Sequence, residues 1–354
     1  MAFLSSCPGG SCLTRDHHKH RLAIRSRLQR SLCCTTARTE QQVQAQEVER
    51  PKHFFGRVIT ALVTPFKLTG VEVDYGVAES LAAHLAENGS DAIIVAGTTG
   101  ESATLTWSEE YELFRVVKSA VAGTKCRVIA GAGSNSTEEA IEATKKSAKL
   151  GLDGTLQVVP YYNKPPQQGI MAHFRAIANA APDLPMMLYN IPGRTGINMT
   201  AETSIKLAEM CPNIVALKEA SGNLEQFARI RRATSPDFAL YSGDDALTLP
   251  LLSLGGNGVV SVASHFIGPE IQRMIEHFVD LGNPEEAFRI HCRYMDLFEA
   301  LFVMANPIPA KAALRLLGWP VGPTRLPLTD ITASAEQQLR QAMIAAGLLS
   351  NGSG

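Results

Sequence analysis

Short apolar runs alternate with longer amphipathic stretches along most of the chain. Eight runs have the length and the bounding turn residues of buried β-strands. They are Val58–Val63, Ala92–Ala96, Arg127–Ala130, Gly154–Val159, Met186–Tyr189, Ile214–Leu217, Phe238–Tyr241 and Gly258–Val262. Helical patterns lie between them at Tyr75–Glu87, Ser108–Val121, Thr137–Leu150, Gly169–Ala180, Ala201–Glu209, Leu224–Ala233 and Ala246–Leu254. The pattern therefore predicts strands that alternate with helices.

This alternation predicts the fold class. Strands that are separated by one helix each form right-handed β-α-β units with parallel strands. Eight such strands in sequence predict an α/β fold of the (β/α)8 TIM-barrel class. A doubly wound open sheet is the alternative. That fold is expected to have a Gly-x-Gly-x-x-Gly fingerprint after its first strand, and the sequence has none there. Gly131-Ala132-Gly133, after a later run, lacks the third glycine.

Only helical patterns continue after about Gly282. The three stretches Pro284–Met304, Pro309–Leu317 and Ser334–Ala346 are each expected to form a helix. We therefore expect a barrel domain over residues 54–282, a C-terminal helical domain over residues 283–349 and a tail over residues 350–354.

The first 53 residues differ in composition from the rest. Up to Arg38 they hold seven basic residues and one acid, Asp16, with frequent serines and no continuous apolar segment. Residues 1–53 are therefore expected to be an organelle transit peptide and a polar linker, both disordered. A disordered basic tail is the alternative. We expect import into the plastid (chloroplast) stroma, with the mitochondrion as the alternative, because composition separates the two poorly.

Bulk composition argues against several classes of protein. Of 354 residues, 45% are hydrophobic and 19% are charged, as in ordinary globular proteins. The formal net charge of −1 gives no electrostatic reason to expect nucleic acid or an anionic membrane as a partner. No apolar run approaches the length of a membrane span.

The cysteines argue against a metal site. Four of the seven lie within the first 34 residues. The others, Cys126, Cys211 and Cys292, are isolated, with no Cys-x-x-Cys spacing and no histidine pair nearby. We therefore expect neither a disulfide framework nor a zinc site, and a reducing compartment fits best.

Lys218 is the first candidate for chemistry, because it directly follows the apolar run Ile214–Leu217. A lysine at the mouth of a buried strand is costly to keep as an ammonium ion. Desolvation lowers its pKa, and the neutral amine can attack a ketone to form a Schiff base. The alternative is a lysine whose stem packs on the strand while its head reaches solvent.

Other polar residues follow the apolar runs, where a barrel carries its active site. Thr98 and Thr99, in the threonine loop Gly97–Ser102, could cradle a carboxylate with their hydroxyls and backbone amides. A structural turn is the alternative. Tyr161 and Tyr162 could form an interaction surface or a proton relay.

Three further runs end in chemically useful residues. Tyr189 could act as a general acid. Arg194, on a rigid Pro/Gly loop, could hold a carboxylate through two hydrogen bonds, with a surface ion pair as the alternative. Asp244-Asp245 has no histidine at metal-binding spacing, and we expect His265 to be packed or at the surface rather than catalytic.

A lysine, a tyrosine, an arginine and hydroxyl and amide donors should thus converge on one face. No phosphate loop, metal set or nucleotide fingerprint accompanies them. This combination suits a cofactor-free aldolase. The lysine would form an imine with a keto acid, the tyrosine would move protons, and the threonine loop would hold the keto acid's carboxylate. The arginine would bind a second anionic substrate.

Five motifs resemble those of the 4-hydroxy-tetrahydrodipicolinate synthases (dihydrodipicolinate synthases), in the superfamily of N-acetylneuraminate lyase and class I aldolases. They are Gly97–Ser102, Tyr161–Asn163, Tyr189–Gly196, Lys218–Asn223 and Asn306–Pro309. The resemblance runs from about Gly56 to Leu349. It implies condensation of pyruvate with L-aspartate-4-semialdehyde, the first committed step of lysine biosynthesis by the diaminopimelate route.

The resemblance also implies roles for the candidate catalytic residues. Lys218 would carry pyruvate as a covalent imine, without any cofactor. Tyr189 would donate and accept protons. Thr98 would link it to Tyr162 from a neighbouring subunit, in a homotetramer built as a dimer of tight dimers.

For substrate binding, the resemblance implies that Thr99 holds the pyruvate carboxylate. Arg194 would take the carboxylate of the semialdehyde at the entrance. Gly97 and the backbone carbonyl of Val260 would line the pocket. Gly193 stands where these synthases commonly have serine, which removes a hydroxyl but leaves the arginine.

Feedback inhibition by L-lysine is a further implication. The positions that match an inhibitor site at the tight-dimer interface are Ser102, Ala103, Trp107, Glu110, Asn135, Glu139 and Tyr161. The two glutamates could take the ammonium groups of the ligand, and Asn135 and Tyr161 its carboxylate. The alternative is that Trp107 and Glu110 are simply exposed in the first turn of a helix.

Two other functions remain open. One is a lyase for a sialic or sugar-derived keto acid, from which Arg194 and the Tyr161-Tyr162 pair distinguish the chain. The other is a non-catalytic barrel that senses keto acids or lysine.

Overall fold

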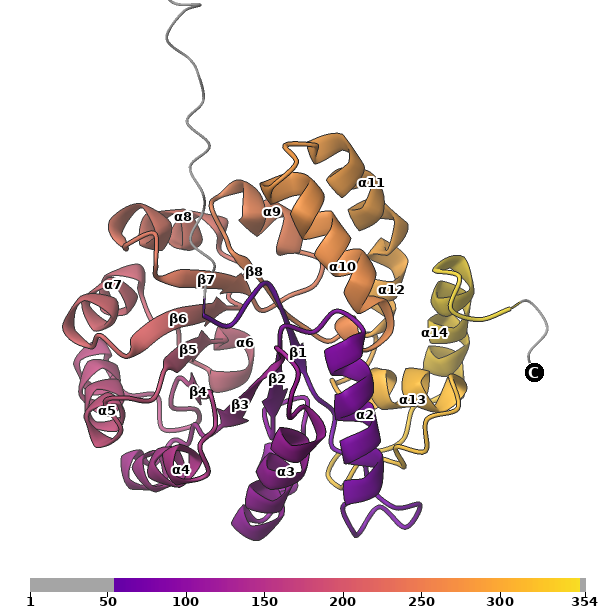
Figure 1. Cartoon of the computed structure of the whole chain (residues 1–354), viewed down its shortest axis with the longest axis horizontal. Coiled ribbons are helices and arrows are strands. Elements are labelled where there is room, and N and C mark those ends of the chain that lie inside the picture. Colours follow the sequence, from indigo (N-terminus) through magenta and orange to yellow (C-terminus); the bar gives the residue numbers. More distant parts are fainter. Residues whose placement is uncertain (1–53, 351–354) are drawn as a thin grey trace, which may run out of the picture. The chain divides into compact units, whose positions relative to one another are not determined.

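The eight strands form a closed parallel barrel, in the order in which they occur along the chain (Figure 1). The computed structural model describes residues 54–350, so the predicted leader and most of the predicted tail lie outside the described residues. The strands are β1 (Val58–Ala61), β2 (Ala92–Val95), β3 (Arg127–Gly131), β4 (Gly154–Val158), β5 (Met186–Asn190), β6 (Ile214–Glu219), β7 (Ala239–Ser242) and β8 (Gly258–Ser261). The predicted (β/α)8 class is confirmed, and the open sheet is excluded.

Helices follow the strands and surround the barrel (Figure 1). Those predicted are α2 (Tyr75–Glu87), α3 (Trp107–Ala120), α4 (Thr137–Lys149), α5 (Gln167–Ala180), α7 (Ala201–Met210), α8 (Leu224–Ala233) and α9 (Thr248–Ser253). Five of them, α2, α3, α4, α7 and α8, begin at a residue whose side chain accepts a hydrogen bond from a free backbone amide, whereas α5 and α9 have no such cap. In α3, Thr106 and Glu109 form a reciprocal capping box.

Three short or irregular elements were not predicted. They are the single turn η1 (Ser102–Thr104), α6 (Pro192–Thr195) and α10 (Ser264–Val279). Pro269 lies inside α10, and Ile267 has non-helical backbone angles there. A proline and a kink interrupt the periodic signal on which a helix prediction depends.

Four helices complete the chain, namely α11 (Pro284–Arg293), α12 (Met295–Ala300), α13 (Ile308–Leu316) and α14 (Ala333–Ala345). The prediction of a single helix over Pro284–Met304 is therefore wrong. The helix is interrupted at Tyr294, and the second helix ends at Ala300, before residue 304. Figure 1 shows α13 and α14 on the side of the barrel where α2 lies. The rings of His84 in α2 and Trp319 lie 5.3 Å apart and join the two regions.

Side chains at alternate strand positions fill the barrel. Successive residues of a strand point to opposite faces. Met187 and Tyr189 of β5 therefore pack in an apolar cluster of strand side chains inside the barrel, the interior cluster. Leu188 packs in a second cluster, between strands and helices, which is the outer cluster. Phe55 is 1% exposed and packs against the start of β4. A side-chain carbon at Gly154 would stand 2.7 Å from its ring. Apolar packing therefore fills the amino end of the barrel.

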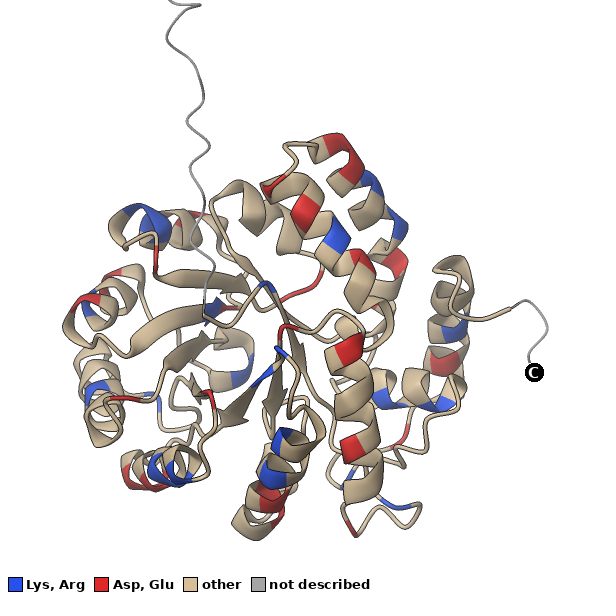
Figure 2. Cartoon of the chain, viewed as in Figure 1, with Lys and Arg blue, Asp and Glu red and all other residues tan. Residues whose placement is uncertain are grey.

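Charges of both signs are interspersed along outer helices such as α3 and α4 (Figure 2). Within residues 54–350, no helix combines the length and the apolar character that crossing a membrane requires.

Candidate active site

Lys218 projects from β6 into the barrel. Ala216 of the same strand belongs to the interior cluster and Leu217 to the outer one, so the strand period turns residue 218 inward. Its side chain is buried, with 7% of the residue exposed. A side-chain carbon at Gly243 would stand 3.1 Å from Lys218 Cε, so this glycine leaves room for the lysine. The alternative of a lysine head in solvent is excluded.

Burial changes the protonation of Lys218. Its pKa is lowered to about 7, mainly by desolvation; the charge of Asp245 opposes this shift, and the nearby Arg194 charge adds a smaller lowering effect. A large fraction of the amine is therefore neutral near pH 7. A neutral amine in a water-poor site is the form that attacks a carbonyl carbon.

Tyr189 lies beside the lysine because β5 and β6 pair Tyr189 with Lys218 in register. Lys218 Nζ is 4.2 Å from the centre of the tyrosine ring. Burial raises the pKa of Tyr189 to about 12, while the Arg194 charge and a hydrogen bond with Thr98 lower it less. The phenol therefore keeps its proton at neutral pH and can donate it to a reacting oxygen.

The threonine loop Gly97–Ser102 follows β2 at the same end of the barrel. Thr98 is exposed and reaches Tyr189 through its hydroxyl. Thr99 is 4% exposed, and its Oγ1 accepts a hydrogen bond of 2.8 Å from Asn306 Nδ2. An added carbon at Gly131 would stand 2.2 Å from the carbonyl oxygen of Ala96, so β3 touches the loop backbone directly. Gly97 is half-buried at the start of the loop.

Arg194 stands on α6, which begins at Pro192 and follows β5. Its side chain is exposed and forms no ion pair with a described residue, so the surface ion pair considered above is absent there. Its positive charge lowers the pKa of both Lys218 and Tyr189. In each case burial has the larger effect, which lowers the pKa of Lys218 and raises that of Tyr189. The guanidinium is therefore an available cation close to the two buried groups.

Tyr162 and Val260 complete the predicted catalytic and substrate-binding set. Tyr162 is 89% exposed, so within one chain its ring stands in solvent and away from the buried groups. Val260 is 2% exposed and pairs with Ile59 between β8 and β1. The structure thus brings together Lys218, Tyr189 and Thr98, but not Tyr162.

Two polar residues near the strand ends serve the fold. Asp245 is buried and accepts hydrogen bonds from the amides of Val262 and Ala263 at 3.0 and 3.1 Å. It ties the end of β7 to that of β8, and its charge raises the pKa of Lys218 against the larger effect of burial. His265 is 4% exposed and accepts from the Val63 amide, so it is packed, as expected.

The seven predicted inhibitor-site residues fall into separate groups. Ser102 donates to Glu110 at 2.6 Å, and Asn135 donates to the carbonyl of Tyr161 at 3.1 Å. Burial raises the pKa of Glu110 to about 7, despite the Ser102 hydrogen bond. Ala103 is exposed on η1.

Trp107 and Glu139, the remaining two of the seven, line a pocket of about 400 Å³. Its other lining residues are Tyr111, Ser136, Glu138 and Glu142. Trp107 is 42% exposed at the start of α3, and Ser134 donates to Glu139 at 2.7 Å.

Sequence reasoning missed residues that reach the site from far along the chain. Asn306 contacts Thr99, and Lys311 pairs with Glu101 in the threonine loop. Asn306 lies in one of the five motifs, but no periodic or spacing signal connects it with residue 99. Among residues 54–350, no three His, Cys, Asp or Glu side chains cluster in a way that could hold a metal ion.

The family model of the Dihydrodipicolinate synthetase family matches residues 54–346. A 4-hydroxy-tetrahydrodipicolinate synthase of the cyanobacterium Thermosynechococcus vestitus is 61% identical over 295 residues, which cover 83% of this chain and 98% of that protein.

Solved structures also resemble the chain, at lower sequence identity. A dihydrodipicolinate synthase of Thermotoga maritima is 41% identical, with a TM-score of 0.81, and the match covers 84% of this chain and all of that chain. A chloride-inhibited dihydrodipicolinate synthase of Acinetobacter baumannii, complexed with pyruvate, is 36% identical with a TM-score of 0.79. That match covers 83% of this chain and 100% of the other.

Proposed function

Because the chain belongs to the dihydrodipicolinate synthetase family, as its motifs predict, we propose that it condenses pyruvate with L-aspartate-4-semialdehyde to give 4-hydroxy-tetrahydrodipicolinate. This reaction is the first committed step of lysine biosynthesis by the diaminopimelate route. The observation that carries the proposal is the buried Lys218, whose pKa is about 7 and whose amine lies against Tyr189. It supports imine chemistry without a cofactor.

The first half of the reaction forms an imine on Lys218. The neutral amine attacks the carbonyl carbon of pyruvate, and the oxygen takes a proton that Tyr189 can supply. A carbon–nitrogen double bond forms as water leaves. Loss of a proton from the former methyl group then gives an enamine, whose carbon is the nucleophile of the next step.

The second half joins the two substrates. The enamine carbon attacks the aldehyde carbon of the semialdehyde, a carbon–carbon bond forms, and the new alkoxide takes a proton. The amino group of the semialdehyde then attacks the imine carbon, which closes the ring and releases Lys218 as an amine. We assign the proton transfers to Tyr189, connected through Thr98 to Tyr162 of a neighbouring subunit.

Two anion-binding groups would orient the substrates. Thr99 and the amides of the threonine loop are assigned to the pyruvate carboxylate, beside Gly97 and the carbonyl of Val260. Arg194 is assigned to the carboxylate of the semialdehyde, since a guanidinium can bind it through two parallel hydrogen bonds.

Borohydride trapping tests the assignment. Wild type incubated with pyruvate and borohydride should carry a reduced adduct on the Lys218 peptide. Lys218→Ala should carry none, whereas the exposed Lys206→Ala should behave as wild type. A coupled assay with both substrates should then show condensation. Folded protein without an adduct would refute the proposal, and turnover of a sugar-derived keto acid alone would favour the related lyases.

We also propose that L-lysine inhibits the enzyme at the predicted positions around Trp107 and Glu139. The pocket beside them is lined by three carboxylates and two aromatic rings, a setting that suits an ammonium group. Calorimetric titration with L-lysine should show binding, which Glu139→Gln weakens. No binding to wild type at millimolar L-lysine would refute this assignment.

For the assembly and its location, we propose a homotetramer in the plastid stroma. Tyr162 supports the assembly, because its exposed ring can reach a neighbour's site. Light scattering should give a mass near four chains. The basic residues 1–53 and the likeness to cyanobacterial enzymes support the location. Import of a fluorescent protein fused to residues 1–53 into isolated chloroplasts, compared with mitochondria, tests it.

A further inference from the structure

The C-terminal segment 306–325 contacts the threonine loop at several points. Asn306 reaches Thr99, while Lys311 and the amide of Arg325 both reach Glu101. These contacts join α13 and the chain after it to the loop assigned above to the pyruvate carboxylate. They suggest that the segment holds this loop in place, besides packing against the barrel.

Glu101 is an unusual residue for such a loop. Its backbone lies in the left-handed region, with φ of 56°, which costs a non-glycine residue on the order of 1 kcal/mol. Ala96, before the loop, has φ of 52°. Two residues in this conformation bracket Gly97–Gly100, so the loop needs contacts from elsewhere to hold its shape.

Lys311 provides such a contact from α13. Its Nζ lies 3.0 Å from Glu101 Oε1, and both side chains are at most 1% exposed. The remaining ammonium hydrogens go to the carbonyls of Thr64 and Pro323, at 2.9 and 2.7 Å. The Thr64 hydroxyl in turn donates to the Gly100 carbonyl at 2.6 Å. A buried ammonium is tolerated where all its hydrogens are bonded in this way.

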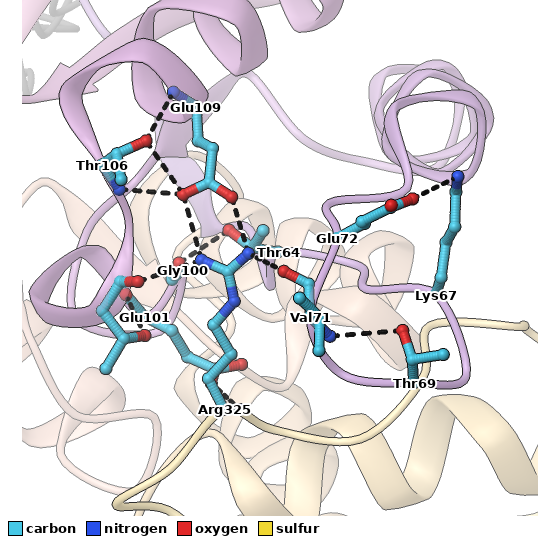
Figure 3. Close-up of polar contacts among 11 residues, drawn as sticks. Thr64, Lys67, Thr69, Val71, Glu72, Gly100, Glu101, Thr106, Glu109 and Arg325 are labelled. Atoms are coloured by element: carbon cyan, nitrogen blue, oxygen red, sulfur yellow. Dashed lines mark hydrogen bonds and ion pairs between the residues drawn. The ribbon is translucent and has the colours of Figure 1, made fainter.

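Arg325 extends the same network to α3 (Figure 3). Its amide donates to Glu101 Oε2 at 2.9 Å, and its guanidinium binds Glu109 at 2.6 Å and the Thr104 carbonyl at 2.9 Å. Glu109 also caps α3 through Thr106. The loop and the start of α3 are thus fixed to one C-terminal segment.

Asn306 acts on a single hydroxyl. Its Nδ2 donates to Thr99 Oγ1, and a threonine hydroxyl has one hydrogen of its own. With its oxygen occupied as an acceptor, Thr99 is left to donate that hydrogen. A carboxylate is a pure acceptor, so this arrangement matches the charge state of a keto acid.

We propose that Asn306 and Lys311 are positioning residues for the keto-acid carboxylate: Lys311, through Glu101, fixes the threonine loop, and Asn306 orients the Thr99 hydroxyl as a donor. This inference rests on the proposed function, because it assigns the loop to the carboxylate of pyruvate. It predicts that both residues act on the first substrate and leave the second unaffected.

Asn306→Ala and the isosteric Asn306→Asp test the hydroxyl. The pyruvate concentration for half-maximal borohydride trapping on Lys218 should rise about tenfold in Asn306→Ala, the usual effect of one lost hydrogen bond. It should rise further in Asn306→Asp, whose carboxylate takes the Thr99 hydrogen and repels the substrate. The KM for the semialdehyde should stay within about twofold of wild type.

A double-mutant cycle separates positioning from general packing. If Asn306 acts through Thr99, adding Asn306→Ala to Thr99→Val should change pyruvate half-saturation by less than about twofold. Independent, additive effects of the two substitutions, or unchanged pyruvate half-saturation in both Asn306 variants, would overturn the role of Asn306.

The ion pair needs a paired substitution, because Lys311→Met alone leaves a buried carboxylate without a partner and can prevent folding. Glu101→Gln with Lys311→Met removes both charges together. Pyruvate half-saturation should rise about tenfold while trapping at saturation stays complete. Arg340→Met, which removes a cation that pairs with Glu336 inside α14, is the control and should match wild type.

Two outcomes separate the inference from the function beneath it. Wild type that traps pyruvate and condenses it, with the paired variant saturating like wild type, overturns only the role of Lys311. Wild type that traps no pyruvate overturns both the inference and the proposed function.

Discussion

At the scale of single residues, Lys218 should give the reaction its pH dependence. Burial lowers its pKa to about 7, so the neutral, nucleophilic form increases as pH rises through that value. The rate of imine formation at low pyruvate should therefore rise between about pH 5.5 and about pH 8.5 and then level off. Stopped borohydride trapping across this range measures it, and a flat profile would contradict the assignment.

Arg194 provides a control for the origin of that pKa. Its positive charge lowers the pKa of Lys218 in addition to the larger effect of burial. Removing the charge in Arg194→Met should therefore move the rising part of the profile to higher pH. A shift to lower pH would show that another group titrates.

Tyr189 should matter for proton transfer rather than for stability. Its phenol keeps its proton at neutral pH, because burial raises the pKa to about 12. Tyr189→Phe keeps the ring against Lys218 but removes the transferable proton, so kcat should fall by about 10² or more. Steady-state kinetics measure the loss, and an unchanged midpoint in thermal unfolding is the control. A kcat within threefold of wild type would leave the tyrosine without this role.

Sequence reasoning worked at this scale where local pattern decides orientation. The apolar run before Lys218 was enough to predict a lysine at the end of a buried strand. Because the side chains of a strand alternate between its two faces, the structure points this lysine into the barrel. Lys311 and Glu101 could not be paired in this way, since 210 positions separate them. Their contact depends on how α13 packs, which no short motif records.

At the scale of elements, the geometry of α6 predicts that position 193 tolerates a larger side chain. An added carbon at Gly193 meets nothing within 4 Å, and the residue does not need a left-handed backbone. Gly193→Ser should therefore fold normally and raise the free energy of unfolding by roughly 0.5 kcal/mol, because it restricts the unfolded chain. Urea unfolding measures this, and a loss of more than about 1 kcal/mol would contradict the open geometry.

The elements that were missed share a physical cause. Eight strands and seven barrel helices repeat a simple period, and each was predicted within about two residues at either end. By contrast, α10 contains a proline and a kink, and α6 is a single turn. Such elements form because the barrel around them supplies partners, so their local sequence carries a weak signal.

At the scale of the whole molecule, the barrel and the C-terminal helices share one site. The carboxyl ends of the strands bring Lys218, Tyr189 and the threonine loop together, as β-α-β topology requires. The loop itself is held by Asn306 and Lys311 from beyond the barrel. Cutting the chain after α10 would therefore remove partners of the catalytic machinery along with apolar packing.

At the same scale, α3 carries one of the residues assigned to the inhibitor site. Glu110 of α3 has a pKa of about 7, raised by burial and by Glu109 and lowered by Ser102. If L-lysine binds through an ammonium group, it favours the ionised carboxylate. Inhibition should then strengthen as pH rises through 7, since more Glu110 is already ionised and less free energy goes into removing its proton.

Measured at about pH 6 and about pH 8, the half-inhibitory concentration of L-lysine should fall about tenfold in wild type, because the ionised fraction of a group with this pKa changes by that factor. Glu110→Gln should bind L-lysine more weakly and lose this dependence. Glu112→Gln, which removes a half-exposed carboxylate from the same helix, should keep it. Equal inhibition of wild type at both pH values, or the same loss in Glu112→Gln, would show that Glu110 does not face the ligand's charge.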